Sequence, residues 1–160
     1  MDIQAILAIL LYIVATFFLA AKIFNVFSIF NKKEWFILFF GLAALFLHAD
    51  ILHESIFTEV GLDFGFFNAI SVIGWLVALI VLFLSFYQPI QQLLLALYPI
   101  AAIALSLEQL IENEYIMKQN LSMGLRIHIF LSICAYSLLM IGTLQALLLS
   151  LQERLIKTKR

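Results

Sequence analysis

Five apolar runs, each long enough to cross a lipid bilayer, constrain the fold of this chain more than any other feature. About 20 predominantly apolar residues span the hydrocarbon core as a helix. The runs lack the period-two alternation of membrane strands. We therefore predict an all-α, polytopic helical membrane bundle, a single membrane domain over residues 1–160, with spans at about residues 3–21, 35–56, 66–87, 90–107 and 127–151.

The overall composition supports a membrane location and excludes several classes of protein. Hydrophobic residues make up 65% of the chain, charged residues only 12%, and the mean hydropathy is +1.12. A small soluble domain cannot bury that much apolar surface. The sequence has no phosphate-binding loop, zinc spacing, nucleophile motif or basic stripe for nucleic acid. We therefore expect contact with the lipid bilayer, no nucleic acid and no enzymatic turnover.

The distribution of Lys and Arg predicts the orientation. With the N-terminus outside, the cytoplasmic side collects seven basic residues and the outer side two. We expect a multi-pass protein of the plasma (bacterial inner) membrane, with its N-terminus outside and its C-terminus in the cytoplasm. Residues 108–126 then form an outer loop, and residues 152–160 form a basic cytoplasmic tail.

Ionisable residues inside a span are costly and are candidates for function. His48 shares one helical face with the small residues Gly41 and Ala44. Small residues let helices approach closely, so we expect His48 to point into the bundle, where it either bonds to a neighbouring helix or serves a site. Asp50 lies about 200° further round the helix and is expected, with His53 and Glu54, to mark the outer interface.

His128 opens the last span, at the head of a small and polar stripe. Such a stripe usually faces protein. One interpretation is packing held by hydroxyl groups, and the other is a metal or haem ligand, because a neutral imidazole offers a lone pair to iron. The stripe contains His128, Ser132, Ala135, Tyr136, Leu139, Thr143, Ala146 and Ser150.

A second polar face combines Asn68, Ser71 and Trp75 in the third span. Asn68 can hydrogen-bond a buried partner. The Trp75 indole can line a macrocycle pocket or anchor the helix at the membrane interface. Residue types alone favour a structural role for this face.

Several segments together resemble the cytochrome c assembly (haem-handling) superfamily of membrane proteins. Residues 126–139 are similar to its histidine-headed helix, including the Ala135-Tyr136 pair, and residues 45–48 resemble its in-membrane histidine segment. Residues 67–71 with Trp75 fit the Asn…Ser…Trp pattern of the next helix. The tetrad at residues 113–116 resembles a YpjD-type inner-membrane branch.

This resemblance implies haem binding or haem handling in cytochrome c biogenesis. His48 and His128 then match axial haem-iron ligands, and Asn68, Trp75 and Tyr136 match residues around the cofactor. The tryptophan-rich outer loop of the superfamily is absent. Its members also continue through further spans, so we expect this chain to be a truncated form.

Two alternatives stay open at this stage. The first is a non-enzymatic regulatory or structural membrane subunit that binds a protein partner or forms an oligomer through its outer loop or basic tail. The second is a transport component, suggested by the acidic outer side and by Pro99 within the fourth span.

Overall fold

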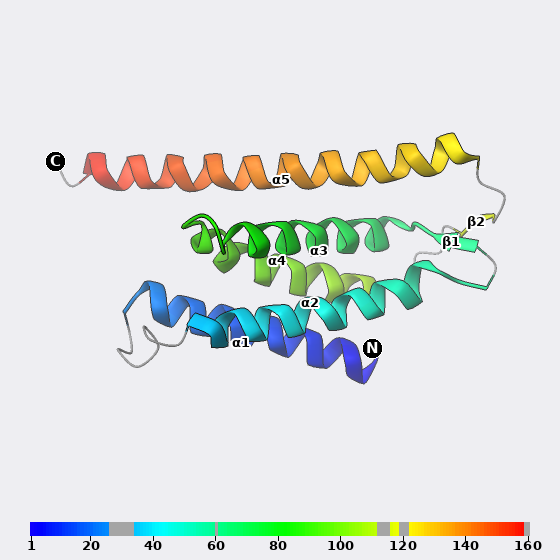
Figure 1. The fold of residues 1–160 in the computed structure, drawn as a ribbon, viewed down its shortest axis with the longest axis horizontal. Helices are drawn as coiled ribbons and strands as arrows, with labels where there is room; N and C mark the ends of the chain where they lie inside the picture. The colour runs from blue at the N-terminus through cyan, green and yellow to red at the C-terminus, as the bar shows by residue number, and fades with distance from the viewer. Residues whose placement is uncertain (26–33, 60, 112–115, 119–121, 159–160) are drawn as a thin grey trace.

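Five long helices form most of the chain in a computed structural model, which describes residues 1–25, 34–59, 61–111, 116–118 and 122–158 (Figure 1). All five are long and apolar enough to cross a membrane, which confirms the predicted all-α membrane bundle. The helices are α1 (Ile3–Ile23), α2 (Glu34–Ile56), α3 (Phe66–Leu84), α4 (Gln91–Leu110) and α5 (Met123–Thr158).

The helix ends differ from the sequence prediction mainly around the predicted outer loop. α4 continues to Leu110 and α5 already begins at Met123, so both ends of the range 108–126 are helical. The predicted tail is also largely helical, because α5 extends to Thr158. Its 36 residues correspond to about 54 Å at 1.5 Å per residue, which exceeds the roughly 30 Å hydrocarbon core.

Helices α1 to α4 pack as a bundle, and α5 lies along its outside. α1 contacts α2 and α4, and α3 contacts α4, α2 and α5. In Figure 1, α5 runs beside α3 and apart from α1. The first residues of α1 and the last turns of α5 lie at opposite ends of the molecule (Figure 1), as an odd number of crossings requires.

Small residues explain how α1 fits so closely against its neighbours. Ala5, Ala8, Tyr12, Ala15 and Leu19 are all fully buried and recur every three or four residues along the helix. This spacing places them on one face. In lipid, helix association depends on close packing rather than on the hydrophobic effect, and small side chains allow it.

A short two-stranded ladder closes one end of the bundle. β1 (Gly61–Asp63) pairs antiparallel with β2 (Ile116–Lys118), and Leu62 lies opposite Met117. Both strands lie in segments that the predicted spans leave outside the helices. α2 and α4 end and α3 and α5 begin next to these strands, and we call this side the β1–β2 end (Figure 1).

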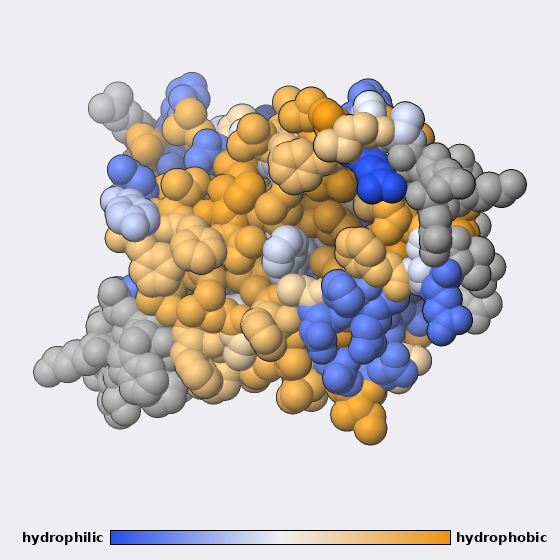
Figure 2. Space-filling model, turned by 45° about the vertical axis from the view of Figure 1, so that its right-hand side comes forward, coloured by the Kyte–Doolittle hydropathy of each residue, from blue (hydrophilic) through white to orange (hydrophobic). Residues whose placement is uncertain are grey.

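Apolar side chains cover most of the outer surface. Figure 2 shows a largely hydrophobic face whose hydrophilic residues gather towards its ends. Large side chains such as Phe17, Phe46 and Ile103 are 59%, 77% and 59% exposed. A soluble monomer rarely exposes so large an apolar surface, so the chain is a membrane protein whose helices contact lipid.

Candidate functional site

A line of polar side chains runs through the interior of α1 to α4. Tyr12 of α1, His48 of α2, Ser71 of α3, and Tyr98 and Glu108 of α4 are each at most 8% exposed. We call these five residues the buried polar cluster. Because most other buried residues are apolar, we treat this cluster as a candidate for chemistry inside the membrane.

His48 is the centre of this cluster. Its Nδ1 atom lies 3.1 Å from the Tyr12 hydroxyl, and its Nε2 atom lies 2.9 Å from Ser71 Oγ. The rings of Tyr12 and His48 also meet edge to face, with centroids 5.8 Å apart. Since a neutral imidazole has one donor and one acceptor nitrogen, these two hydroxyl groups satisfy the whole hydrogen-bonding capacity of the ring.

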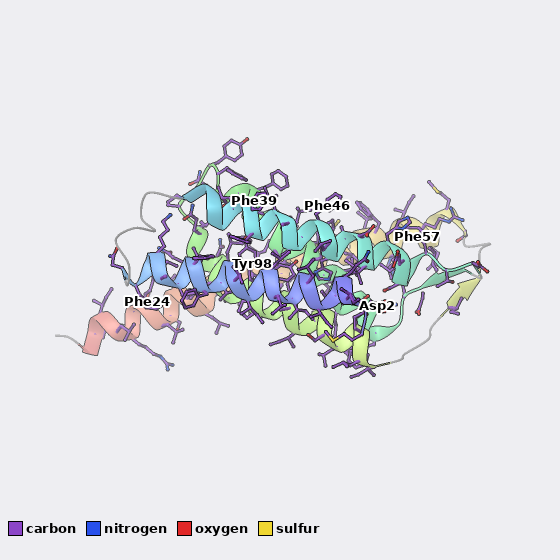
Figure 3. All side chains as sticks on the ribbon, turned by 90° about the horizontal axis from the view of Figure 1, so that it is seen from below. Asp2, Phe24, Phe39, Phe46, Phe57 and Tyr98 are labelled. Atoms are coloured by element: carbon purple, nitrogen blue, oxygen red, sulfur yellow. The ribbon has the colours of Figure 1, made fainter. Side chains whose placement is uncertain are left out.

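Tyr98 extends the cluster away from the β1–β2 end. Its ring lies against Tyr12, with centroids 5.6 Å apart. Figure 3 shows Tyr98 inside the bundle, whereas Phe39 and Phe46 point outward from α2. Gly41 of α2 lies directly against the Tyr98 hydroxyl, and a Cβ atom at Gly41 would overlap it. That hydroxyl is buried and has no hydrogen-bond partner among the described residues.

Glu108 forms the opposite end of the cluster, near the last turn of α4. The residue is only 8% exposed, and both of its carboxyl oxygens are buried. The Ser71 and Ser55 hydroxyls are close enough to interact with it. Neither carboxyl oxygen, however, makes a hydrogen bond of good geometry within the described part of the chain. The prediction that Glu108 belongs to an outer loop is therefore wrong, because α4 carries it into the bundle.

His128 and Tyr136 lie outside the cluster. Both side chains are exposed on α5, and Tyr136 is 62% exposed. The face of α5 that meets the bundle carries Ser137, Met140, Ile141, Leu144 and Leu148 instead. The predicted polar stripe headed by His128 therefore does not pack against the other described spans, since α5 turns its aliphatic side towards them.

Asn68 and Trp75 both make structural hydrogen bonds. The Asn68 amide donates to the backbone oxygen of Asp63 over 3.3 Å, just before α3 begins. The Trp75 indole N–H donates to the backbone oxygen of Leu45 over 2.9 Å and so joins α3 to α2. Neither side chain takes part in the buried polar cluster.

The arrangement bears directly on whether His48 and His128 can hold one haem. His48 is fully buried, and both ring nitrogens are engaged with Tyr12 and Ser71, so iron ligation would require breaking a hydrogen bond. His128 is exposed on another helix. The described residues therefore do not fit a haem ligated by this pair. Of these two imidazoles, that of His128 is open to a ligand from outside the bundle.

An apolar cavity of about 610 Å³ lies close to His128 but on a different side of α5. Its lining residues are Phe57, Thr58, Gly61, Leu62 and Phe64 from the segment after α2, and Arg126, Ile129, Phe130 and Ile133 from α5. These α5 positions recur every three or four residues and share one face. His128 is not among the lining residues, so the cavity does not present a compound to its imidazole. Nor do the described residues bring three His, Cys, Asp or Glu side chains together as a metal site.

Sequence reasoning identified His48 and placed Ser71 on a polar face, but it missed Tyr12 and Glu108. Tyr12 interrupts the small-residue pattern of Ala8 and Ala15, which places it on the packed face of α1. Glu108 follows an apolar run directly, so a helix one turn longer than predicted would have carried it inside. The predicted orientation of His48 towards the bundle interior agrees with its complete burial.

Comparisons with protein-family models, curated proteins and solved structures found no match for this chain.

Proposed function

We propose that this chain is an integral membrane protein that handles haem in cytochrome c biogenesis. The proposal rests on the resemblance of residues 126–139 to a histidine-headed helix, and on one observation: His128 is exposed at the start of α5. An imidazole in that position is available to iron from outside the bundle. On this proposal the protein acts without enzymatic turnover.

Within this proposal His128 supplies an axial ligand, and a second ligand comes from outside the described helices. His48 then has a different role, because Tyr12 and Ser71 occupy both of its ring nitrogens. Asn68 and Trp75 position helix α3 rather than the cofactor. Tyr136 lies two turns from His128 on the exposed side of α5 and remains a candidate for contact with the macrocycle.

The uncovered side of α5 supports a site completed by another membrane protein. We define its open face as His128, Ala135, Leu139, Gly142 and Ala146, which are all exposed. Gln145, beside this face, is exposed too. A histidine or an amide side chain that faces hydrocarbon is energetically unfavourable. Gly142 and Ala146 are two small residues four positions apart, and such a pair favours close approach of another helix. A partner helix on the open face would cover the polar side chains and would pack against the two small residues.

This same face favours the second candidate function, a regulatory or structural subunit that binds a membrane partner without haem. The two candidates share the partner helix and differ in the cofactor. A photo-reactive amino acid at Leu139 should therefore cross-link to a partner in native membranes, whereas one at the exposed Ile103 of α4 should cross-link mainly to lipid. Equal protein cross-linking at both positions would count against a specific α5 interface.

A haem spectrum decides between the candidates. The protein is purified from haem-supplied cells as wild type, His128→Ala, His48→Ala and His53→Ala. The haem proposal expects a Soret band in the wild type that is lost in His128→Ala and retained in His53→Ala, whose histidine is exposed on α2 at the same end of the bundle. It also expects His48→Ala to keep the band.

A wild-type protein without a Soret band would remove the haem proposal and leave the partner-binding subunit. A band that survives His128→Ala would remove His128 as the ligand.

A further inference from the structure

Glu108 has a buried carboxyl group without hydrogen-bond donors among the described residues, and the proposed haem function does not use this group. It is 8% exposed, and neither of its carboxyl oxygens has a hydrogen-bond partner of good geometry among the described residues. Leu105, one turn earlier on α4, packs with Ala5, Ala8 and Ile51. The carboxyl group therefore lies beside an apolar layer made by three helices.

An ionised carboxylate is poorly stabilised in these surroundings. Moving a charge out of water without a compensating partner costs far more than moving a neutral acid, and such groups take up a proton instead. Elements packed around Glu108 present Ser71 of α3 and Ser55 of α2 to it, and both side chains are uncharged hydroxyls. The titratable groups Asp50, His53 and Glu54 of α2 are exposed to the outside of the bundle.

Ser71 connects this carboxyl group to the rest of the buried polar cluster. Its hydroxyl oxygen lies 2.9 Å from His48 Nε2, and it is also a neighbour of the Glu108 carboxyl group, without a hydrogen bond of good geometry between the two. A hydroxyl group donates one hydrogen bond and accepts others, so Ser71 can bond to both neighbours at once. Tyr12 continues the chain from His48 Nδ1. Hydrogen bonds therefore connect Tyr12, His48 and Ser71, and the Glu108 carboxyl group lies next to the last of them.

The position of Glu108 along α4 places it near one end of the bundle. It lies two residues before the end of α4 at Leu110, and Ser55 lies one residue before the end of α2 at Ile56. Both therefore belong to the last helical turn at the β1–β2 end. His48 lies two turns deeper than Ser55 on α2. Glu108 is therefore closer to the β1–β2 end than His48 is, and the apolar middle of the bundle does not lie between Glu108 and this end.

We propose that Glu108 is a proton-binding site, loaded from water at the β1–β2 end and placed next to the hydrogen-bonded pair of His48 and Ser71. On binding, a carboxylate oxygen forms an O–H bond with a proton from water. On release, that bond breaks and the proton returns to water, which leaves the carboxylate. The exchange needs no further reactant, and it does not depend on haem.

Infrared spectroscopy of the full chain, haem-free and in lipid nanodiscs, tests this proposal. A protonated carboxylic acid has a carbonyl stretching band that a carboxylate lacks, and the band shifts in D₂O. At neutral pH we expect this band in the wild type and in Glu54→Gln, whose carboxylate is exposed. We expect it to be lost in Glu108→Gln, which keeps the shape of the side chain. Absence from the wild type, or persistence in Glu108→Gln, would overturn the proposal.

Two further variants test the link through Ser71 and guard against misfolding. Ser71→Ala removes one hydroxyl neighbour, so the Glu108 band should move to higher frequency. An unchanged band in Ser71→Ala would overturn the connection to His48. Glu108→Asp retains a carboxyl group and should keep a shifted band. If Glu108→Asp folded but lacked the band, protonation at this position would be excluded.

Discussion

The Nε2 atom of His48 lies 2.9 Å from the Oγ atom of Ser71, and this contact joins α2 to α3 inside the bundle. Both residues are fully buried. In a closely packed interior within a membrane, an imidazole nitrogen that loses its partner has no ready replacement. The contact is therefore both a structural link between two helices and the middle of the buried polar cluster.

Removing the Ser71 hydroxyl should destabilise the protein. Ser71→Ala leaves His48 Nε2 without its partner, and an unsatisfied buried polar group costs about 1–3 kcal/mol. Ser106→Ala is the matched control, because the Ser106 hydroxyl donates only to the backbone oxygen of Ala102 in its own helix. The free energy of unfolding is measured by titration with a denaturing detergent. Equal losses in the two variants would argue against a special role for the His48–Ser71 contact.

Gly41 should not tolerate even a methyl group. A Cβ atom there would overlap the Tyr98 hydroxyl, and overpacking a close-packed interior costs about 1–3 kcal/mol. We expect Gly41→Ala to lower the stability in the same unfolding assay. Gly124→Ala is the control, because nothing lies within 4 Å of a Cβ atom at that position on α5. A stable Gly41→Ala protein would mean that α2 and α4 can separate at little cost.

The Tyr98 hydroxyl offers a complementary test at the same contact. It is buried without a described hydrogen-bond partner, so its removal in Tyr98→Phe should leave the stability unchanged or raise it by about 1–3 kcal/mol. The double variant Gly41→Ala/Tyr98→Phe should recover part of the stability lost in Gly41→Ala, because the hydroxyl oxygen is gone while the ring carbon Cζ would still lie 2.9 Å from the added Cβ atom. Additive effects in this double-mutant cycle would show that the two residues are not coupled.

The sequence predicts the membrane bundle well because apolar length is a one-dimensional property. A run such as residues 66–87 crosses a bilayer whatever its neighbours are, and it corresponds to α3 with only a small difference at its end. The inward position of His48 also follows from its own helix, through Gly41 and Ala44. Such properties are encoded locally.

The partners of His48 depend on how four helices are arranged around one another, and no local pattern specifies that. Tyr12 and Ser71 lie 36 and 23 residues from His48 in the chain. The position of α5 is a further example. Its stripe of small and polar residues predicts contact with protein, but it does not specify which protein, and the described helices leave that face open.

The orientation of the bundle in the membrane is the last prediction. The positive-inside rule places the basic end of α5, with Arg154 and Lys157, in the cytoplasm. The β1–β2 end and Glu108 then face the outside. A reporter enzyme that is active only in the cytoplasm should work when it is fused after the last residue. A membrane-impermeant thiol reagent should label Glu59→Cys in intact cells but should not label Lys157→Cys, both in a Cys134→Ser background. Labelling of Lys157→Cys without labelling of Glu59→Cys would reverse the orientation, and Glu108 would then exchange protons with the cytoplasm.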